Sequence, residues 1–166
     1  MDNEILFSET QRFKQWWLWI FLIGWDAFIF YGVSKQIING HPFGNKPASN
    51  RELLIILGIS LLTTILFLVI RLDTQIRKDG VYVKFFPLHL KFRHFSWDQL
   101  SKCYVRKYSP MAEYGGWGLR FGFGGKAYNI SGNQGLQLEF INKKTLLIGT
   151  QKPEELNNAL QKTKEQ

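Results

Sequence analysis

Two long apolar segments constrain this chain more than any other feature of its sequence. Residues 16–33 read WWLWIFLIGWDAFIFYGV and hold one charged residue, Asp26, whereas residues 53–70 read LLIILGISLLTTILFLVI and hold none. As an α-helix, each 18-residue segment would be roughly 27 Å long, close to the thickness of the hydrocarbon core of a bilayer. Helices of a soluble core rarely stay apolar on every side. We therefore predict two transmembrane helices.

The residues that flank these segments favour a helical hairpin. SETQ (residues 8–11) and SNRE (residues 49–52) both match the capping-box pattern, and each precedes an apolar segment. Glycines and prolines in residues 39–47 indicate a loop. A cleavable signal peptide explains the first segment less well, because the segment is longer than a signal-peptide core and no cleavage site of small residues follows it. We expect residues 1–71 to be an N-terminal tail and a two-helix transmembrane hairpin.

The distribution of charge favours one orientation of this hairpin. From Arg71 onward the chain has 16 Lys and Arg against 8 Asp and Glu, so this part carries the whole net charge of +8. Basic residues gather on the cytoplasmic side of membrane proteins. The single cysteine, Cys103, rules out a disulfide within one chain and fits a reducing compartment. We therefore expect both termini to lie in the cytoplasm.

After the second apolar segment, the hydrophobic period changes from helical to alternating. The expected strands are a hairpin in residues 76–85 with Asp79-Gly80 at its turn, and residues 88–95, 101–108, 135–140 and 144–149. The C-terminal segment has Pro153 where a helix would begin and apolar residues at helical spacing after it. Strands followed by one helix indicate a small β-sandwich or open barrel of about seven strands, capped by that helix, in residues 72–166.

Glycines concentrate in one part of this second region. Eight of the 15 glycines lie between Tyr114 and Phe140, and the sequence GGK lies among them. A phosphate-binding P-loop would need a glycine at Arg120 and a serine or threonine at Ala127, and the dinucleotide-binding fingerprint fails at Phe121. We therefore expect no nucleotide cofactor. Gly118, Gly125 and Gly132 are instead expected at turns or bulges, some of them with positive φ.

The same glycine-rich part resembles a known family. EYGGWGLRFGFGGKAYNISGNQGLQLEF, followed by LLIGTQKPEEL, resembles the C-terminal part of bacterial pleckstrin-homology-like (PH-like) domains of small membrane proteins with two spans. The G-x-G-[IL]-R, AYN and IGT-x-x-P-E-E-L segments of that family occur here in the same order. The resemblance is good over residues 113–156 and loose over residues 72–164. It implies a seven-stranded sandwich or barrel with a C-terminal helix in the bacterial cytoplasmic membrane, and it supplies no catalytic residue.

Residues suited to catalysis or metal binding are sparse. His41 lies in the loop between the spans, apart from His89 and His94, and one cysteine makes no zinc pattern. We expect no catalytic site, no metal and no cofactor, and hence a protein that is not an enzyme.

Asp26 lies near the middle of the first apolar segment, where a charge is costly. In an antiparallel hairpin it comes level with Ser60, with Thr63 and Thr64 one turn away. We expect an intramembrane polar contact between Asp26 and one of these hydroxyls, or with a second copy of the chain. A proton or ion relay and a lipid-exposed acid are the alternatives.

Basic side chains alternate with apolar ones on the expected strands. The residues are His89, Lys91, Arg93, Lys102, Arg106, Arg120 and Lys126. A solvated face beside an acidic leaflet would explain them, as would a site for an acidic lipid head group or an acidic protein. Nucleic acid is a poorer partner, because no recognition motif is present.

These observations together predict an integral membrane protein that presents a cytoplasmic PH-like domain. Its expected role is the non-catalytic binding or scaffolding of a partner protein or an acidic lipid head group. The alternative is an accessory subunit of a membrane transport or envelope-maintenance complex that uses Asp26 within the bilayer.

Overall fold

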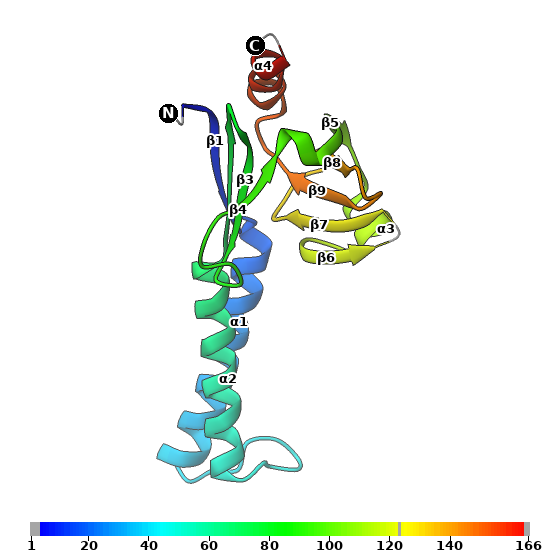
Figure 1. Ribbon diagram of the computed structural model, residues 1–166. Coiled ribbons are helices and arrows are strands. Elements are labelled where there is room, and N and C mark those ends of the chain that lie inside the picture. The colour runs from blue at the N-terminus through cyan, green and yellow to red at the C-terminus, as the bar shows by residue number, and fades with distance from the viewer. Residues whose placement is uncertain (1–3, 123, 165–166) are drawn as a thin grey trace. The chain divides into compact units, whose positions relative to one another are not determined.

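The computed structural model describes residues 4–122 and 124–164, and the chain forms two compact units. Lys14–Val69 forms a helical unit. Met1–Phe13 and Ile70–Gln166 together form a β-rich unit, and most of its strands and helices are labelled in Figure 1. The N-terminal segment was expected to be a tail of the hairpin, but its residues 5–12 belong to the β-rich unit.

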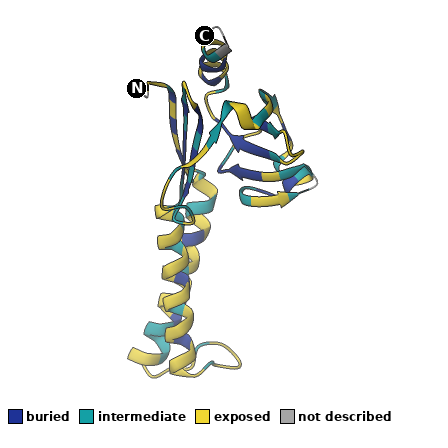
Figure 2. Cartoon of the chain, in the orientation of Figure 1, coloured by how far each residue is buried: buried dark blue, intermediate teal, exposed yellow. Residues whose placement is uncertain are grey.

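The helical unit contains α1 (Trp16–Val33), a π-helical turn (Ser34–Ile38) and α2 (Asn50–Val69). Trp16–Ile38 and Asn50–Val69 are each long and apolar enough to cross a membrane. Most of their large apolar side chains are exposed, as the yellow colour along both helices in Figure 2 shows. A helix of a soluble core would bury such side chains, so this exposure is compatible with a membrane protein.

Only one of the two predicted capping boxes forms. At the start of α2, the Ser49 N–H donates to Glu52 Oε2 at 2.8 Å and the Glu52 N–H donates to Ser49 Oγ at 3.3 Å. The prediction for residues 8–11 is wrong, because these residues lie in a strand. α1 begins several residues later, after Gln15, whose side chain makes no capping hydrogen bond.

The first sheet has the order β1-β2-β3-β4, with antiparallel neighbours. Its strands are β1 (Ile5–Arg12), β2 (Arg71–Arg77), β3 (Gly80–Phe86) and β4 (Arg93–Ser96). In β3, Val81, Val83 and Phe85 are buried at every second position, as the alternating pattern predicts. Arg77 pairs with Gly80, so the hairpin turn consists of Lys78 and Asp79, one residue before its predicted place.

The second sheet has the order β5-β8-β9-β7-β6. Its strands are β5 (Leu100–Lys107), β6 (Gly118–Gly122), β7 (Gly125–Asn129), β8 (Gln134–Phe140) and β9 (Thr145–Gly149). A short 3₁₀ turn (Trp97–Gln99) precedes β5, and a short helix, α3 (Pro110–Tyr114), follows it. Among the described strands of this sheet, β7 and β9 run parallel and the other neighbours are antiparallel. The described residues thus hold nine strands rather than about seven: the six strands located from the sequence, together with β1 and the two strands of the glycine-rich hairpin β6–β7.

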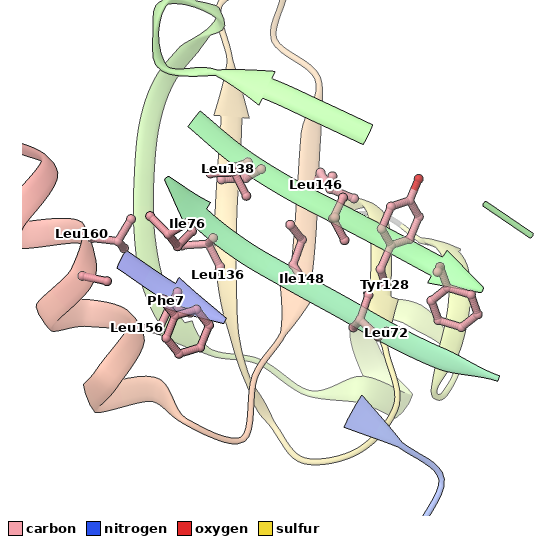
Figure 3. Close-up of a cluster of buried hydrophobic side chains, with 14 of the residues drawn as sticks. Phe7, Leu72, Ile76, Tyr128, Leu136, Leu138, Leu146, Ile148, Leu156 and Leu160 are labelled. Atoms are coloured by element: carbon pink, nitrogen blue, oxygen red, sulfur yellow. The ribbon is translucent and has the colours of Figure 1, made fainter. Parts of the chain in front are cut away.

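The main core of the β-rich unit lies between these sheets. Phe7, Leu72 and Ile76 of the first sheet belong to one buried cluster with residues of the second sheet, including Leu136 and Ile148 (Figure 3). The C-terminal helix α4 (Pro153–Lys164) adds its apolar face to this cluster, since Leu156, Ala159 and Leu160 are 1%, 3% and 4% exposed. The predicted arrangement of strands with a C-terminal helix is therefore confirmed at this coarse level.

One predicted strand is largely absent. Residues 88–95 were expected to alternate between two faces, but residues 87–92 form a loop and only Arg93–Ser96 is a strand. Leu88 and Leu90 are both exposed, so the alternating pattern there does not reflect a buried sheet face.

Candidate functional site

An open groove of about 1050 Å³ lies in the β-rich unit. It is lined by β4, by the 3₁₀ turn, by the facing ends of β6 and β7, and by the turn between β8 and β9. Its volume lies just above the usual range of ligand-binding pockets, which is about 300–1,000 Å³.

The walls of the groove are mainly apolar and aromatic. Phe95 and Phe140 pack edge to face, with ring centroids 5.3 Å apart. Tyr128 and Leu146 also line the groove and belong to the buried core behind it. Phe121, at the end of β6, is 68% exposed. The groove thus has one wall that is held in place by the core and, beside it, the exposed ring of Phe121. This combination is suited to an apolar group of a ligand.

Four cationic side chains border these walls, namely Arg93, Lys126, Lys143 and Lys144, together with one carboxylate, that of Asp98. Arg93 Nη1 donates to the Tyr128 hydroxyl at 3.2 Å, and Lys126 Nζ lies 5.2 Å from the centroid of the Phe121 ring. In the described part of the chain, no carboxylate oxygen lies within 4 Å of any of the four cationic groups. The groove therefore carries uncompensated positive charge beside apolar surface.

Local backbone geometry brings these cations together. Gly125 has a φ of +97°, and a Cβ atom there would lie 2.0 Å from Thr145 Oγ1, so only glycine fits where β7 approaches the start of β9. Thr145 Oγ1 donates to the Gly124 carbonyl at 2.6 Å. The resulting register pairs Lys126 with Leu146, close to the turn that holds Lys143 and Lys144. The prediction of positive φ at Gly118, Gly125 and Gly132 is confirmed.

A second polar site lies in the helical unit. The Asp26 carboxylate accepts a hydrogen bond from Ser60 Oγ on one oxygen and from Thr64 Oγ1, at 2.7 Å, on the other. Ser60 is buried, at 7% exposure. Thr63 does not join them, because its hydroxyl donates to the Ile59 carbonyl of its own helix at 2.8 Å. The structure thus brings together three of the four residues proposed for this contact.

Comparison with protein families decides where the chain belongs. The model of a family of unknown function, DUF6141, matches residues 2–164. The chain belongs to the DUF6141 family. No curated protein matches the chain, and no solved structure matches it. Membership of the DUF6141 family assigns no activity, so the function of this protein must be argued from its own residues.

The seven basic residues expected to form one face are divided in this DUF6141 protein. Arg93 and Lys126 line the groove. His89 lies directly behind it, with its ring edge to face against Tyr128 at 5.3 Å between centroids. Burial and the neighbouring charge of Arg93 lower the pKa of His89. Lys91 is exposed in the loop that follows β3. These four residues lie on or near β4 and β7.

The other three lie elsewhere in the DUF6141 fold. Lys102 is exposed on β5, at the opposite edge of the second sheet from the β6–β7 hairpin. Arg106 forms an ion pair with Glu113 at 2.7 Å, and this hydrogen bond lowers the pKa of the Glu113 carboxyl. Arg120 pairs with Ala127 across β6 and β7, so it faces away from Lys126, and its Nε donates to the Trp117 carbonyl at 2.9 Å.

Lys143 and Lys144 were missed by sequence reasoning. They lie in the turn between β8 and β9, and Lys143 has a φ of +63°. An alternating pattern selects only residues within strands, and these two lysines lie in a turn outside any strand. Two adjacent lysines between two predicted strands were the available signal.

Metal binding is not indicated by the part of this DUF6141 protein that the structure describes. Within residues 4–122 and 124–164, no three histidine, cysteine, aspartate or glutamate side chains are grouped so that they could hold an ion.

Proposed function

We propose that this protein is a multi-pass protein of the bacterial cytoplasmic membrane, with both termini in the cytoplasm. In this proposal the β-rich unit is a PH-like domain that binds acidic lipid head groups without catalysing a reaction. Two helices able to cross a membrane and a net charge of +8 that lies wholly after residue 70 support it. Two packed sheets with a C-terminal helix support the PH-like assignment, although the nine described strands exceed the expected seven.

The observation that carries the proposal is the groove with its four cations. Arg93, Lys126, Lys143 and Lys144 have no carboxylate partner within 4 Å in the described part of the chain, so their charge is available to a ligand. Each cation near an acidic membrane surface contributes about 1 kcal/mol of attraction. A lipid phosphate at this border would meet several cations at once.

The connections between the two units favour a ligand at the membrane. Three residues separate β1 from α1, and one residue separates α2 from β2. Because an extended chain covers at most about 3.6 Å per residue, neither connection can span more than roughly 15 Å. A β-rich unit on connections this short would act at the membrane surface rather than at a distance from it.

The alternative role, as an accessory subunit of a transport or envelope-maintenance complex, depends on Asp26. Both carboxylate oxygens of Asp26 already accept hydrogen bonds within the hairpin, from Ser60 and Thr64. A partner protein would have to replace these bonds, and this requirement favours the lipid-binding proposal.

The test compares acidic and zwitterionic lipids on the full chain in detergent. Phosphatidylglycerol and phosphatidylcholine with the same acyl chains are titrated, and the lipid-bound fraction is followed by native mass spectrometry. The groove variant is Lys126→Gln/Lys144→Gln. The matched control, Lys102→Gln/Lys107→Gln, removes the same charge from exposed positions on β5.

We expect the groove variant to bind phosphatidylglycerol about thirtyfold more weakly than the wild type, because two cations worth about 1 kcal/mol each are lost. The control should bind nearly as the wild type does, and the difference should shrink as salt screens the charges. Equal binding by both double variants, or no preference of the wild type for phosphatidylglycerol, would contradict the proposal. Tight binding of an acidic protein in place of lipid would favour the scaffolding role.

A further inference from the structure

The loop between β3 and β4, residues 87–92, exposes large apolar side chains that do not pack against the rest of the protein. Leu88 is 65% exposed and Leu90 is 78% exposed. Leu90 is the most exposed large apolar side chain among the described residues, ahead even of those on the two apolar helices. Leu88 and Leu90 flank His89, and neighbouring exposed apolar side chains on a folded domain are typical of sites of interaction with a protein or a membrane.

Contacts of the neighbouring residues hold this loop in a defined shape. The His89 N–H donates to the Phe85 carbonyl at 2.8 Å, and the Phe85 N–H donates to His89 Nδ1 at 3.3 Å. The His89 ring packs against Tyr128, and Lys84 Nζ lies 4.6 Å from the centroid of the Phe92 ring. His89 therefore points inward, between two leucines that point outward.

The register of the first sheet places this loop at a particular end of the β-rich unit. Arg12 pairs with Arg71, and Arg71 pairs with Phe86, so these three residues form one row across β1, β2 and β3. The chain leaves for the helical unit just after Arg12 and returns from it just before Arg71. The loop begins directly after Phe86, so it leaves the sheet at the same end as both connections.

The charge at this end suits an acidic membrane surface. Lys91, next to Leu90, is exposed, and Arg12 is exposed at the end of β1. Residues 87–92 contain no aspartate or glutamate. Exposed apolar side chains with adjacent cations are typical of segments that enter the boundary between lipid head groups and acyl chains, to a depth of about 5–10 Å.

We propose that residues 87–92 are a membrane-inserting loop, in which Leu88 and Leu90 enter the interface of the bilayer that the two helices cross. Lys91 then lies at the level of the lipid phosphates, where acidic lipids attract it. The inference rests on the proposed membrane-spanning function and adds a second point of attachment. It fixes the orientation of the β-rich unit, which two short covalent connections alone would leave free to rotate.

A fluorescent label on the full chain tests this proposal. Cysteine is introduced at position 90 in a background where Cys103, which is half-buried in β5, is replaced by alanine. The protein is reconstituted in vesicles of phosphatidylcholine and phosphatidylglycerol, and an environment-sensitive dye is attached. Quenching by phospholipids with brominated acyl chains and by aqueous iodide is then measured. Circular dichroism checks that each variant is folded.

Labels at two other positions serve as controls for the aqueous and the membrane environment. Met111 is 65% exposed on α3, and Ile59 is 61% exposed on α2. We expect the label at 90 to be quenched by shallowly brominated lipid and protected from iodide, the label at 59 to be quenched by deeply brominated lipid, and the label at 111 to be quenched by iodide alone.

The results separate this inference from the proposed function. If the label at 59 is quenched by lipid but the label at 90 is as open to iodide as the label at 111, only the loop proposal is overturned. Protection from iodide at 90 without quenching by lipid would show that protein covers the loop, and would also overturn it. If the label at 59 is not quenched by lipid, the membrane-spanning function fails and the loop proposal fails with it.

Discussion

Asp26 shows how a single residue can be placed from the sequence through helix geometry. Its position near the middle of an apolar segment, opposite Ser60 in an antiparallel hairpin, was sufficient to predict a polar contact. The structure gives Asp26 two hydroxyl donors, Ser60 and Thr64, one for each carboxylate oxygen. Sequence could not choose between Thr63 and Thr64, because that choice depends on the rotation of α2 about its axis.

A pair of substitutions at Asp26 tests whether these hydrogen bonds stabilise the hairpin. Asp26→Asn keeps an oxygen that can accept from one hydroxyl, and its amide group can donate to the other, so we expect it to retain most of the stability in detergent. Asp26→Leu keeps none and should lose about 1 kcal/mol for each lost bond. The midpoint of unfolding in detergent measures both. A leucine variant more stable than the asparagine variant would contradict the hydrogen-bond account.

A pH dependence follows from His89. Its pKa in the folded protein is lowered by burial and by Arg93, so the unfolded state binds a proton more readily than the folded state does. Stability should therefore fall as pH drops through about 6.5, the ordinary pKa of histidine, and should level off once the pH is below the lowered value.

The matched variant for this prediction is His89→Phe, which keeps an aromatic ring near Tyr128 but cannot titrate. The decrease in Tm between pH 7.5 and pH 5 should be larger for the wild type than for the variant. An equal decrease in both proteins would show that other groups cause the pH dependence.

At the scale of elements, β1 shows why sequence reasoning took a strand for a tail of the helical hairpin. Residues 5–12 alternate as a strand should, but two of the inward-facing residues are Glu9 and Gln11, which are polar. The structure accommodates them with long-range partners. Thr150 Oγ1 and the Gln151 N–H donate to Glu9 at 2.6 and 2.8 Å, and Gln11 Nε2 donates to the Gly149 carbonyl at 2.6 Å. Because the partner of the buried Glu9 side chain lies about 140 residues away, the sequence around β1 contains no pattern that would predict its burial.

The importance of this contact can be measured on β1 itself. Glu9→Ala would leave two donors at the end of β9 without a partner, and we expect a loss of about 2 kcal/mol. Ser8→Ala, at an exposed position of the same strand, should change stability very little. Thermal unfolding of the full chain in detergent compares the two. If both variants unfold at the wild-type temperature, Glu9 does not stabilise the junction of β1 with β9.

At the scale of the whole molecule, the pairing of β1 with β2 makes the helical unit an insertion within the β-rich unit. The chain forms one strand, then the two apolar helices, and then the neighbouring strand of the same sheet. The predicted boundary at residue 71 therefore needs correction, because residues 5–12 are part of the β-rich unit. Both ends of the helical unit connect to adjacent strands, so both must lie on the same side of any membrane that it crosses.

Labelling in intact cells tests the orientation. A cysteine at position 45, in the loop between the helices, should react with a membrane-impermeant reagent, whereas a cysteine at position 161, in α4, should react only after the cells are opened. Labelling at 161 in intact cells would reverse the proposed orientation.

The sequence by itself determined the two apolar helices, most strands of the second sheet and the C-terminal helix. Each of these depends on a local period that the hydrophobic effect imposes on neighbouring residues. Only the tertiary structure revealed β1, the loop at residues 87–92 and the groove. β1 depends on partners far along the chain, and Leu88 and Leu90 alternate like strand residues although no sheet covers them. The four cations of the groove come from β4, β7 and a turn, and only the parallel pairing of β7 with β9 next to Gly125 brings the last two of these together.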